Sequence, residues 1–318
     1  MRIGYTMMCE QRSPRDLVRD IVAAEQAGFE FSVISDHYHP WVEGQGHSPY
    51  AWSVLGAAAQ ATERIGLMTY VTAPIMRYHP AVVAQKAATM ALLSDGRFRL
   101  GLGAGENLNE HVVGQGWPAV DIRHEMLAEA VEIIAELFSG EYVTYRGDHF
   151  DVESAKLFDL PETPVPIGLA ISGPDSAELA AEYAGMMIAT QPDAQLIKLF
   201  QNAGGEGSSS GQMMISWGPD EAAQRKLAHD NFGWTAGGWK IQAELPGPVN
   251  FQAFVDVVPE ETVVENIVCG PDVDQIVEQA KKWADAGFDE LALVQLGDTQ
   301  AEFCEFYKRE LGPRLAKL

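Results

Sequence analysis

Basic residues, cysteines and long apolar runs are all scarce in this sequence of 318 residues. Only 22 residues are Lys or Arg, against 45 Asp and Glu, so the formal net charge is -23. A surface of this charge repels nucleic acids and anionic membranes, and we expect neither as a partner. An anionic ligand would need a local site made of backbone N–H groups and a few basic side chains.

The three cysteines, Cys9, Cys269 and Cys304, are too few and too scattered to predict a disulfide framework or a zinc site. No apolar run reaches membrane-spanning length, and no signal-peptide core is visible near Met1. We therefore expect a cytoplasmic protein without a metal centre. Hydrophobic residues make up 47% of the chain, which is typical of a globular protein with a sizeable core.

Strand-like and helix-like segments alternate along the chain. The first half has predicted strands at 3–7, 29–35, 65–73 and 98–103, and predicted helices at 16–27, 51–63, 81–93 and 124–138. The second half adds strands at 165–171, 186–190, 213–216 and 291–296, and helices at 175–183, 272–286 and 300–310. Consecutive strand–helix units favour a parallel sheet, and about eight of them predict an α/β fold of the (β/α)8 TIM-barrel type. The pattern alone leaves a doubly wound sheet open.

Three segments interrupt the alternation. Residues 142–151 are predicted to form a β-hairpin, and 204–211 (Gly-Gly-Glu-Gly-Ser-Ser-Ser-Gly) a flexible loop. Residues 231–258 are rich in Gly, Trp and Pro. We interpret them as an irregular insertion that could cover an active site, within a single barrel domain spanning 1–318.

Residues able to carry chemistry follow the second predicted strand, where a parallel barrel places its active site. Asp36, His37, His39 and Trp41 lie within seven consecutive residues, 35–41. They offer an acid/base pair beside an aromatic wall. The alternative is a loop in which Asp36 caps backbone N–H groups and the imidazole is simply hydrogen-bonded. A metal site would need a third ligand, and none is obvious nearby.

Two further strand ends carry glycine-rich sequences. Residues 101–105 contain Gly-x-Gly-x-Gly after the fourth strand, whereas a dinucleotide-binding fingerprint follows the first strand. These glycines more plausibly let a flat ring lie close to the backbone, with Glu106 as a carboxyl at the barrel mouth. Ser172 and Gly173 precede a predicted helix, so their N–H groups could hold a phosphate or form a plain N-cap.

Four strings, taken together, resemble the luciferase-like flavin and deazaflavin oxidoreductases. They are 35–41 (Ser-Asp-His-Tyr-His-Pro-Trp), 73–85 (Ala-Pro-Ile-Met-Arg-Tyr-His-Pro-Ala-Val-Val-Ala-Gln), 103–110 (Gly-Ala-Gly-Glu-Asn-Leu-Asn-Glu) and 172–174 (Ser-Gly-Pro). The resemblance is narrower to the coenzyme F420-dependent branch, which contains glucose-6-phosphate and secondary alcohol dehydrogenases. It implies a (β/α)8 barrel, usually a homodimer, that transfers a hydride with F420 bound in the barrel mouth.

The resemblance also implies roles for individual residues. His37 would lie beside the reactive carbon of the cofactor, Glu106 would be the matching acid/base or orienting carboxyl, and Trp41 would pack at the substrate. The implied cofactor contacts are Asp36, Tyr70, Val71, Asn109, Ser172 and Gly173, with a cis peptide bond between Tyr70 and Val71. The residues implied at the substrate, besides Trp41, are Glu10 and His39. Which of His37 and Glu106 carries the proton stays open.

One departure from the branch bears on the substrate. The sugar-phosphate members place a Lys in the loop after the sixth strand, whereas this chain has Asp193 there, and Glu265 lies near the second expected basic position. A phosphate dianion facing two acids would be repelled. We therefore expect a neutral alcohol, ketone or activated alkene rather than glucose 6-phosphate. A reduced-FMN-dependent monooxygenase on the same fold and a barrel that only binds the cofactor are the alternatives.

Overall fold

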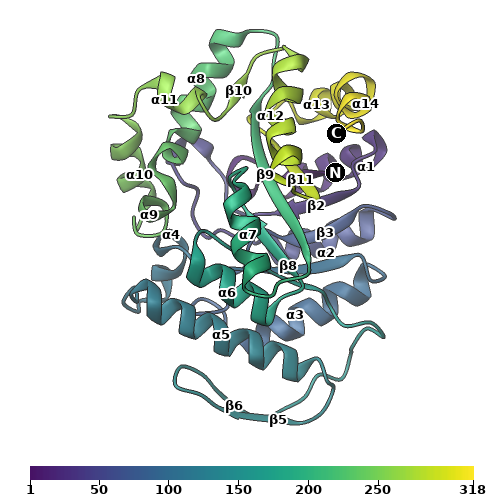
Figure 1. Ribbon diagram of the computed structural model, residues 1–318, viewed down its shortest axis with the longest axis vertical. Helices are drawn as coiled ribbons and strands as arrows, with labels where there is room; N and C mark the ends of the chain where they lie inside the picture. Colours follow the sequence, from purple (N-terminus) through teal and green to yellow (C-terminus); the bar gives the residue numbers. More distant parts are fainter.

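Eight parallel strands form a closed barrel in the computed structural model, which describes all residues 1–318 (Figure 1). The barrel strands are β1 (Arg2–Met7), β2 (Phe31–Ile34), β3 (Gly66–Thr69), β4 (Phe98–Leu102), β7 (Ile167–Ala170), β8 (Met186–Ala189), β9 (Ser208–Ser216) and β11 (Glu290–Gln295). They are hydrogen-bonded in the order β9-β11-β1-β2-β3-β4-β7-β8, and β8 pairs again with β9 to close the ring. This closure confirms the predicted barrel and excludes the doubly wound sheet.

Helices follow the strands and surround the barrel (Figure 1). The longer ones are α1 (Pro14–Ala27), α2 (Ala51–Ala61), α3 (Pro80–Leu93), α5 (Val120–Leu137), α6 (Pro174–Tyr183), α7 (Ala194–Asn202), α8 (Glu221–Phe232), α12 (Val273–Ala286) and α13 (Gln300–Phe306). Their ends follow local sequence: α1 begins after Ser13, whose side chain accepts a hydrogen bond from the Asp16 N–H, and ends at Gly28 with φ 98°. No helix combines the length and the apolar character needed to cross a membrane.

Short elements lie mainly at the ends of the strands and helices. They are η1 (Cys9–Gln11), η2 (Glu43–Gln45), α4 (Asn107–Glu110), η3 (His111–Val113), α11 (Glu260–Val264), β10 (Val268–Cys269), η5 (Tyr307–Leu311) and α14 (Gly312–Leu315). The predicted hairpin is present as β5 (Val143–Arg146) and β6 (Asp151–Ala155), and it continues beyond the predicted end at residue 151. Figure 1 shows this hairpin projecting away from the barrel.

Two segment predictions need correction. Residues 208–211 are not loop but the start of β9, because the small side chains there fit a tightly packed position between β8 and β11. A Cβ on Gly211 would come within 2.3 Å of the Trp283 ring. Residues 231–258 are not irregular but contain η4 (Gly233–Gly237), α9 (Gly238–Gln242) and α10 (Pro248–Val255), which are too short to show a clear helical period in the sequence.

The core consists of three apolar clusters. The largest fills the space between the strands and the outer helices, and a small one that includes Phe31, Met68 and Ile188 fills the barrel interior. The third joins the 231–258 segment to the barrel mouth, where Trp41, Trp234 and Phe251 are all buried. This third cluster therefore packs the segment against the loops of the barrel mouth.

Candidate active site

His37 lies between two carboxylates at the carboxyl end of the barrel strands. Its Nδ1 is 3.0 Å from Oε1 of Glu10, and its Nε2 is 3.2 Å from Oε2 of Glu106. The side chains of His37, Glu10 and Glu106 are 11%, 1% and 16% exposed. They come from the segments after β2, β1 and β4, so the barrel brings together residues that are far apart in the sequence. Such a group can hold, accept and donate a proton.

Burial controls the charge of Glu106. Removal of its carboxylate from water and the nearby Glu10 and Glu110 carboxylates together raise the pKa of Glu106 to about 7, against the opposing effect of His37. Asn109 also favours the carboxylate, because its Nδ2 donates a hydrogen bond of 2.9 Å to Oε2 of Glu106. The raised pKa moves the titration of this carboxyl toward neutral pH, as suits an acid/base group.

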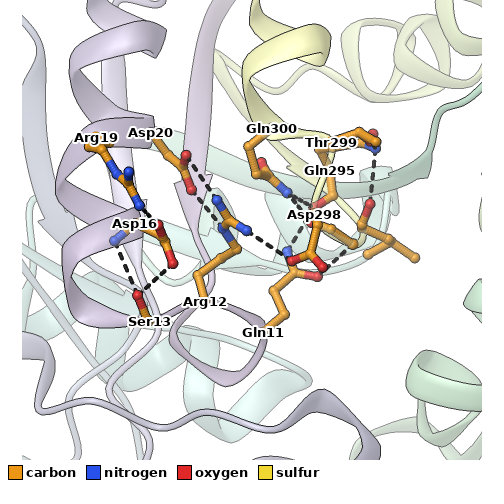
Figure 2. Close-up of polar contacts among 12 residues, drawn as sticks. Gln11, Arg12, Ser13, Asp16, Arg19, Asp20, Gln295, Asp298, Thr299 and Gln300 are labelled. Carbon is orange, nitrogen blue, oxygen red and sulfur yellow. Dashed lines mark hydrogen bonds and ion pairs between the residues drawn. The ribbon is translucent and has the colours of Figure 1, made fainter.

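A polar network fixes the short η1 turn that carries Glu10 (Figure 2). Gln11 donates from Nε2 to the Gln295 carbonyl at 2.8 Å and accepts at Oε1 from the Gly297 N–H at 2.9 Å. Arg12 donates hydrogen bonds to Asp20 in α1 and to Asp298 in the loop after β11. Figure 2 shows these side chains linking the first and last βα segments of the chain. The turn is therefore anchored by the two residues that follow Glu10.

Ser35 fixes the Glu10 carboxylate itself. The Ser35 hydroxyl donates to Oε2 of Glu10 at 2.6 Å and accepts from the Cys9 N–H at 3.0 Å. Oε1 of Glu10 is thereby left facing the imidazole of His37.

Asp36 is buried beneath the His37 loop, and protein donors surround its carboxylate. Oδ2 accepts from Trp52 Nε1 at 3.0 Å and from Thr72 Oγ1 at 2.6 Å, while Oδ1 accepts from the Tyr78 hydroxyl at 3.1 Å. Arg77 donates to the Asp36 carbonyl at 2.6 Å. In this structure the residue anchors its loop, and the cofactor contact implied by the resemblance stays a prediction.

Arg77 and Glu110 form a buried ion pair that the sequence analysis missed. Their side chains are 8% and 1% exposed, and Nε of Arg77 lies 3.5 Å from Oε1 of Glu110. The guanidinium also lies 3.3 Å from the Asp36 carboxylate. Both residues stand in strings that carry the resemblance, and Glu110 follows Glu106 at helical spacing, which was the available signal. Arg77 thus partly neutralises two acids below the site.

Asn109 links the His37 loop to Glu106. Its Oδ1 accepts from the Tyr38 N–H at 2.8 Å and the His39 N–H at 3.3 Å. Because its Nδ2 donates to Glu106, one amide sets the spacing between the two loops. Its implied contact with a cofactor stays a prediction.

Trp41 closes one side of the site. Its ring stacks on Trp234 at 3.9 Å, meets the edge of Phe251 at 5.0 Å and lies 5.0 Å from the His37 ring. Trp234 was not predicted, although a Trp-rich insertion was a usable signal. The His39 ring does not join this group but stacks on the His111 ring, with 5.9 Å between the ring centres. The roles of Trp41 and His39 toward a substrate stay predictions.

The peptide bond between Tyr70 and Val71 is cis, as the resemblance implied. The Tyr70 hydroxyl donates to the Ser210 carbonyl at 2.9 Å. Val71 packs closely on Gly103: a Cβ atom added to Gly103 would lie 2.6 Å from Cγ2 of Val71. The glycine therefore permits the end of β3 to approach the end of β4.

Ser172 and Gly173 lie at the start of α6. Their N–H groups donate to the hydroxyl of Ser176 at 3.0 and 3.2 Å, so a serine inside the first turn of the helix accepts from them, and no side chain caps the helix from the N-cap position. Phosphate binding at this turn stays a prediction.

Free positive charge is scarce around the mouth. Asp193 is exposed at the start of α7, where it accepts a hydrogen bond from the Gln195 N–H, and Glu265 is exposed at the end of α11. Arg225, in α8, forms an ion pair with Glu260 at 2.8 Å. Arg77 is likewise occupied by buried acids.

The chain belongs to the luciferase-like monooxygenase family, whose sequence profile matches residues 1–290. Its curated relatives include the F420-dependent glucose-6-phosphate dehydrogenases of Beutenbergia cavernae and Tsukamurella paurometabola, each 36% identical to it. The alignments cover 99% and 100% of this chain and 97% and 99% of the two relatives. The predicted family is therefore confirmed.

Solved structures agree with this assignment. An F420-dependent secondary alcohol dehydrogenase in complex with an F420-acetone adduct is 29% identical and has a TM-score of 0.92, with 99% of this chain and 98% of that chain covered. The coenzyme F420-dependent tetrahydromethanopterin reductase of Methanopyrus kandleri is 20% identical, with a TM-score of 0.77 and coverage of 99% of both chains. The second likeness concerns the fold alone.

Proposed function

We propose that this protein is a coenzyme F420-dependent oxidoreductase that transfers a hydride between the cofactor and a small neutral alcohol, ketone or activated alkene. The observation that carries the proposal is His37 held between Glu10 and Glu106 at the barrel mouth. The names of the relatives and of the most similar solved structure support F420 as the cofactor. Loss of hydride from an alcohol requires a base near its hydroxyl, and the site offers one.

The residues at the mouth fit a flat deazaflavin ring. Val71, Ala104 and Gly105 are small and partly exposed beside Glu106, so a ring can lie against them. By resemblance, we assign the contacts with the remainder of the cofactor to Asn109 and to the turn at 172–173, whose amide groups bond within the chain in this structure. When bound, F420 supplies a ring carbon that accepts or donates the hydride.

His37 is the proposed proton carrier. Its Nδ1 faces two acceptors, Oε1 of Glu10 at 3.0 Å and the His39 carbonyl at 3.3 Å, which favours a proton on Nδ1. When Glu106 is charged, Nε2 can accept the hydroxyl proton of an alcohol, and it can return that proton to a ketone in the reverse direction. Glu106, with its pKa near 7, can donate to Nε2 in its neutral form or orient the imidazolium in its charged form.

The proposed substrate is neutral because Arg77 and Arg225, the arginines near the mouth, are both paired with acids. The acids at 193 and 265 stand where the sugar-phosphate members have basic residues, and the net charge of -23 adds long-range repulsion. This chain would then differ in substrate from the relatives named as glucose-6-phosphate dehydrogenases.

Binding and turnover assays test the proposal. Purified protein should bind F420 tightly and FMN poorly in parallel titrations. An absorbance screen of alcohols, ketones and enones against oxidised and reduced F420 should find turnover. Equal or tighter binding of FMN would favour the monooxygenase alternative, and tight F420 binding without any turnover would favour a cofactor-binding protein.

The proposal extends to assembly. We propose a cytoplasmic homodimer of single-domain subunits, with 231–258 inserted in the barrel. Val82, Leu92 and Leu93 on α3 are exposed apolar residues and offer part of a contact surface. Sedimentation equilibrium should give twice the mass of the 34.7 kDa chain.

A further inference from the structure

Asn107 fastens the 231–258 segment to the barrel mouth. Its N–H donates to the Ala243 carbonyl at 2.9 Å, and its Nδ2 donates to the Glu244 carbonyl at 3.0 Å. Asn107 directly follows Glu106 in the chain and begins α4. The segment is therefore hydrogen-bonded to the residue that directly follows the acid/base carboxyl of Glu106.

Arg123 makes a second attachment to the same turn. This arginine is 2% exposed, and its Nη2 donates to Oε1 of Glu244 at 2.8 Å. Its Nε and Nη1 have no hydrogen-bond partner, and the guanidinium lies 4.3 Å from the centre of the Trp117 ring. Glu244 is thus the only carboxylate that pairs with Arg123.

The burial of Arg123 makes this pair unlike an ordinary surface ion pair. Exposed pairs contribute little, because both charges stay hydrated when they separate. Here Glu244 is 54% exposed but the side chain of Arg123 is only 3% exposed, so separation would leave an unpaired charge in the protein interior. The pair therefore favours the docked position of the segment.

Apolar packing covers the next residue of α4. Leu108 is fully buried in the cluster that contains Trp41, Trp234 and Phe251. The segment thus covers both residues that follow Glu106, one by hydrogen bonds and one by packing.

We propose that Arg123 and Glu244 are positioning residues that hold the 231–258 segment over α4, and that the segment thereby excludes water from Glu106. The inference rests on the proposed function only for the acid/base role of Glu106. The groups that face this carboxyl are His37, Glu10, Glu110 and Asn109. None belongs to the segment, so undocking would act on Glu106 through hydration rather than through a lost charge.

The first test uses the cofactor-free protein and Glu244→Ala. Amide hydrogen exchange should accelerate about tenfold or more over 238–247, because these residues lose their attachment to α5. The carboxyl titration of Glu106, followed by 13C NMR and assigned with Glu106→Gln, should move from near 7 toward the ordinary glutamate range by about one pH unit as water enters. Glu244→Gln, which keeps an oxygen that can accept from Arg123, should give a smaller change in both.

Glu260→Ala is the matched control. Glu260 pairs with Arg225 at 2.8 Å just beyond the segment. Both side chains of this pair are partly exposed, and neither contacts α4. It should change neither the exchange nor the titration. Circular dichroism checks that each variant is folded.

Two results would overturn the inference. Unchanged exchange in Glu244→Ala would mean that the ion pair does not hold the segment. Faster exchange with an unchanged Glu106 titration would mean that the segment does not keep water from the carboxyl. Both readouts are independent of F420 and of turnover, so failure of the proposed function would leave them interpretable.

Discussion

The two ends of the barrel differ in how many basic side chains surround their buried carboxylates. At the amino ends of the strands, Glu290 is buried and pairs with two arginines, Arg2 at 2.6 Å and Arg99 at 2.9 Å. The guanidinium carbons lie 5.6 and 5.4 Å from the centre of the Phe31 ring. One acid therefore has two cations and an aromatic ring around it.

The carboxyl end has the reverse balance. Glu10, Glu106, Glu110 and Asp36 lie close to one another, and Arg77 is the only arginine that pairs with any of them. Burial, together with the nearby Glu10 and Glu110 carboxylates, leaves Glu106 with a raised pKa. A barrel of this type uses its amino end for stability and its carboxyl end for chemistry, and the charge balance marks which end is which.

Removing a cation from the amino end should have the largest effect. Arg99→Met leaves Glu290 with only the half-exposed Arg2, and we expect the free energy of unfolding to fall by about 3 kcal/mol. Turnover of the folded protein at low temperature should stay within about twofold, because the site is at the other end. Urea unfolding and initial rates measure the two quantities, and Arg2→Met is the milder control. A turnover loss without a stability loss would contradict the division between the ends.

Removing the imidazole from the carboxyl end should do the opposite. His37→Ala should lower turnover by about 100-fold or more, which corresponds to about 2.7 kcal/mol of activation free energy. The fold should stay intact, since the ring is near the surface of the mouth rather than in the main core. Absorbance of F420 measures turnover, and urea unfolding is the control. Near-normal turnover would transfer the proton-carrying role to Glu106.

The raised pKa of Glu106 predicts a pH-dependent cost in stability. Its folded value of about 7 exceeds its ordinary value of 4.5, so the folded state binds more protons between these pH values. Stability should therefore fall as pH rises through that window, by up to about 1.4 kcal/mol per pH unit.

Glu106→Gln should remove this dependence. The variant should be more stable than the original protein at pH 8, by about 2 kcal/mol, and the gain should vanish below pH 4.5. Thermal unfolding across pH measures the difference. A gain of the same size at every pH would show that relief of packing strain, rather than a buried charge, is responsible.

The sequence predicts the barrel and the central group of the site because their signals are local. Each strand end carries its own string, and a parallel barrel gathers strand ends at one mouth, so Glu10, His37 and Glu106 are expected to meet. Residues 208–211 were misread because Ser and Gly have low strand propensity, whereas close packing against Trp283 overrides propensity there.

The ion pairs could not be predicted in the same way. Arg77 and Glu110 are 33 positions apart, and Arg123 and Glu244 are 121 positions apart. No local pattern links such partners, and only the folded chain shows that each arginine is buried. The charge balance that distinguishes the two ends is therefore a property of the fold rather than of the motifs.

Adding a cation to the mouth should give the smallest effect and sharpens the comparison. Asp193→Lys places a positive charge where the resemblance implies one for sugar-phosphate members, but Asp193 is exposed, so a facing charge in water contributes only about 1 kcal/mol and salt screens it. Inhibition by glucose 6-phosphate should therefore strengthen by no more than about tenfold at low ionic strength, and turnover of this sugar should not appear. Asp193→Asn keeps a cap for α7 and is the control, because it removes the negative charge alone. Saturable oxidation of glucose 6-phosphate by the unaltered protein at micromolar concentration would instead require basic residues such as Lys198 or Lys240 to reach the pocket, and the shortage of positive charge at this end would then not set the substrate.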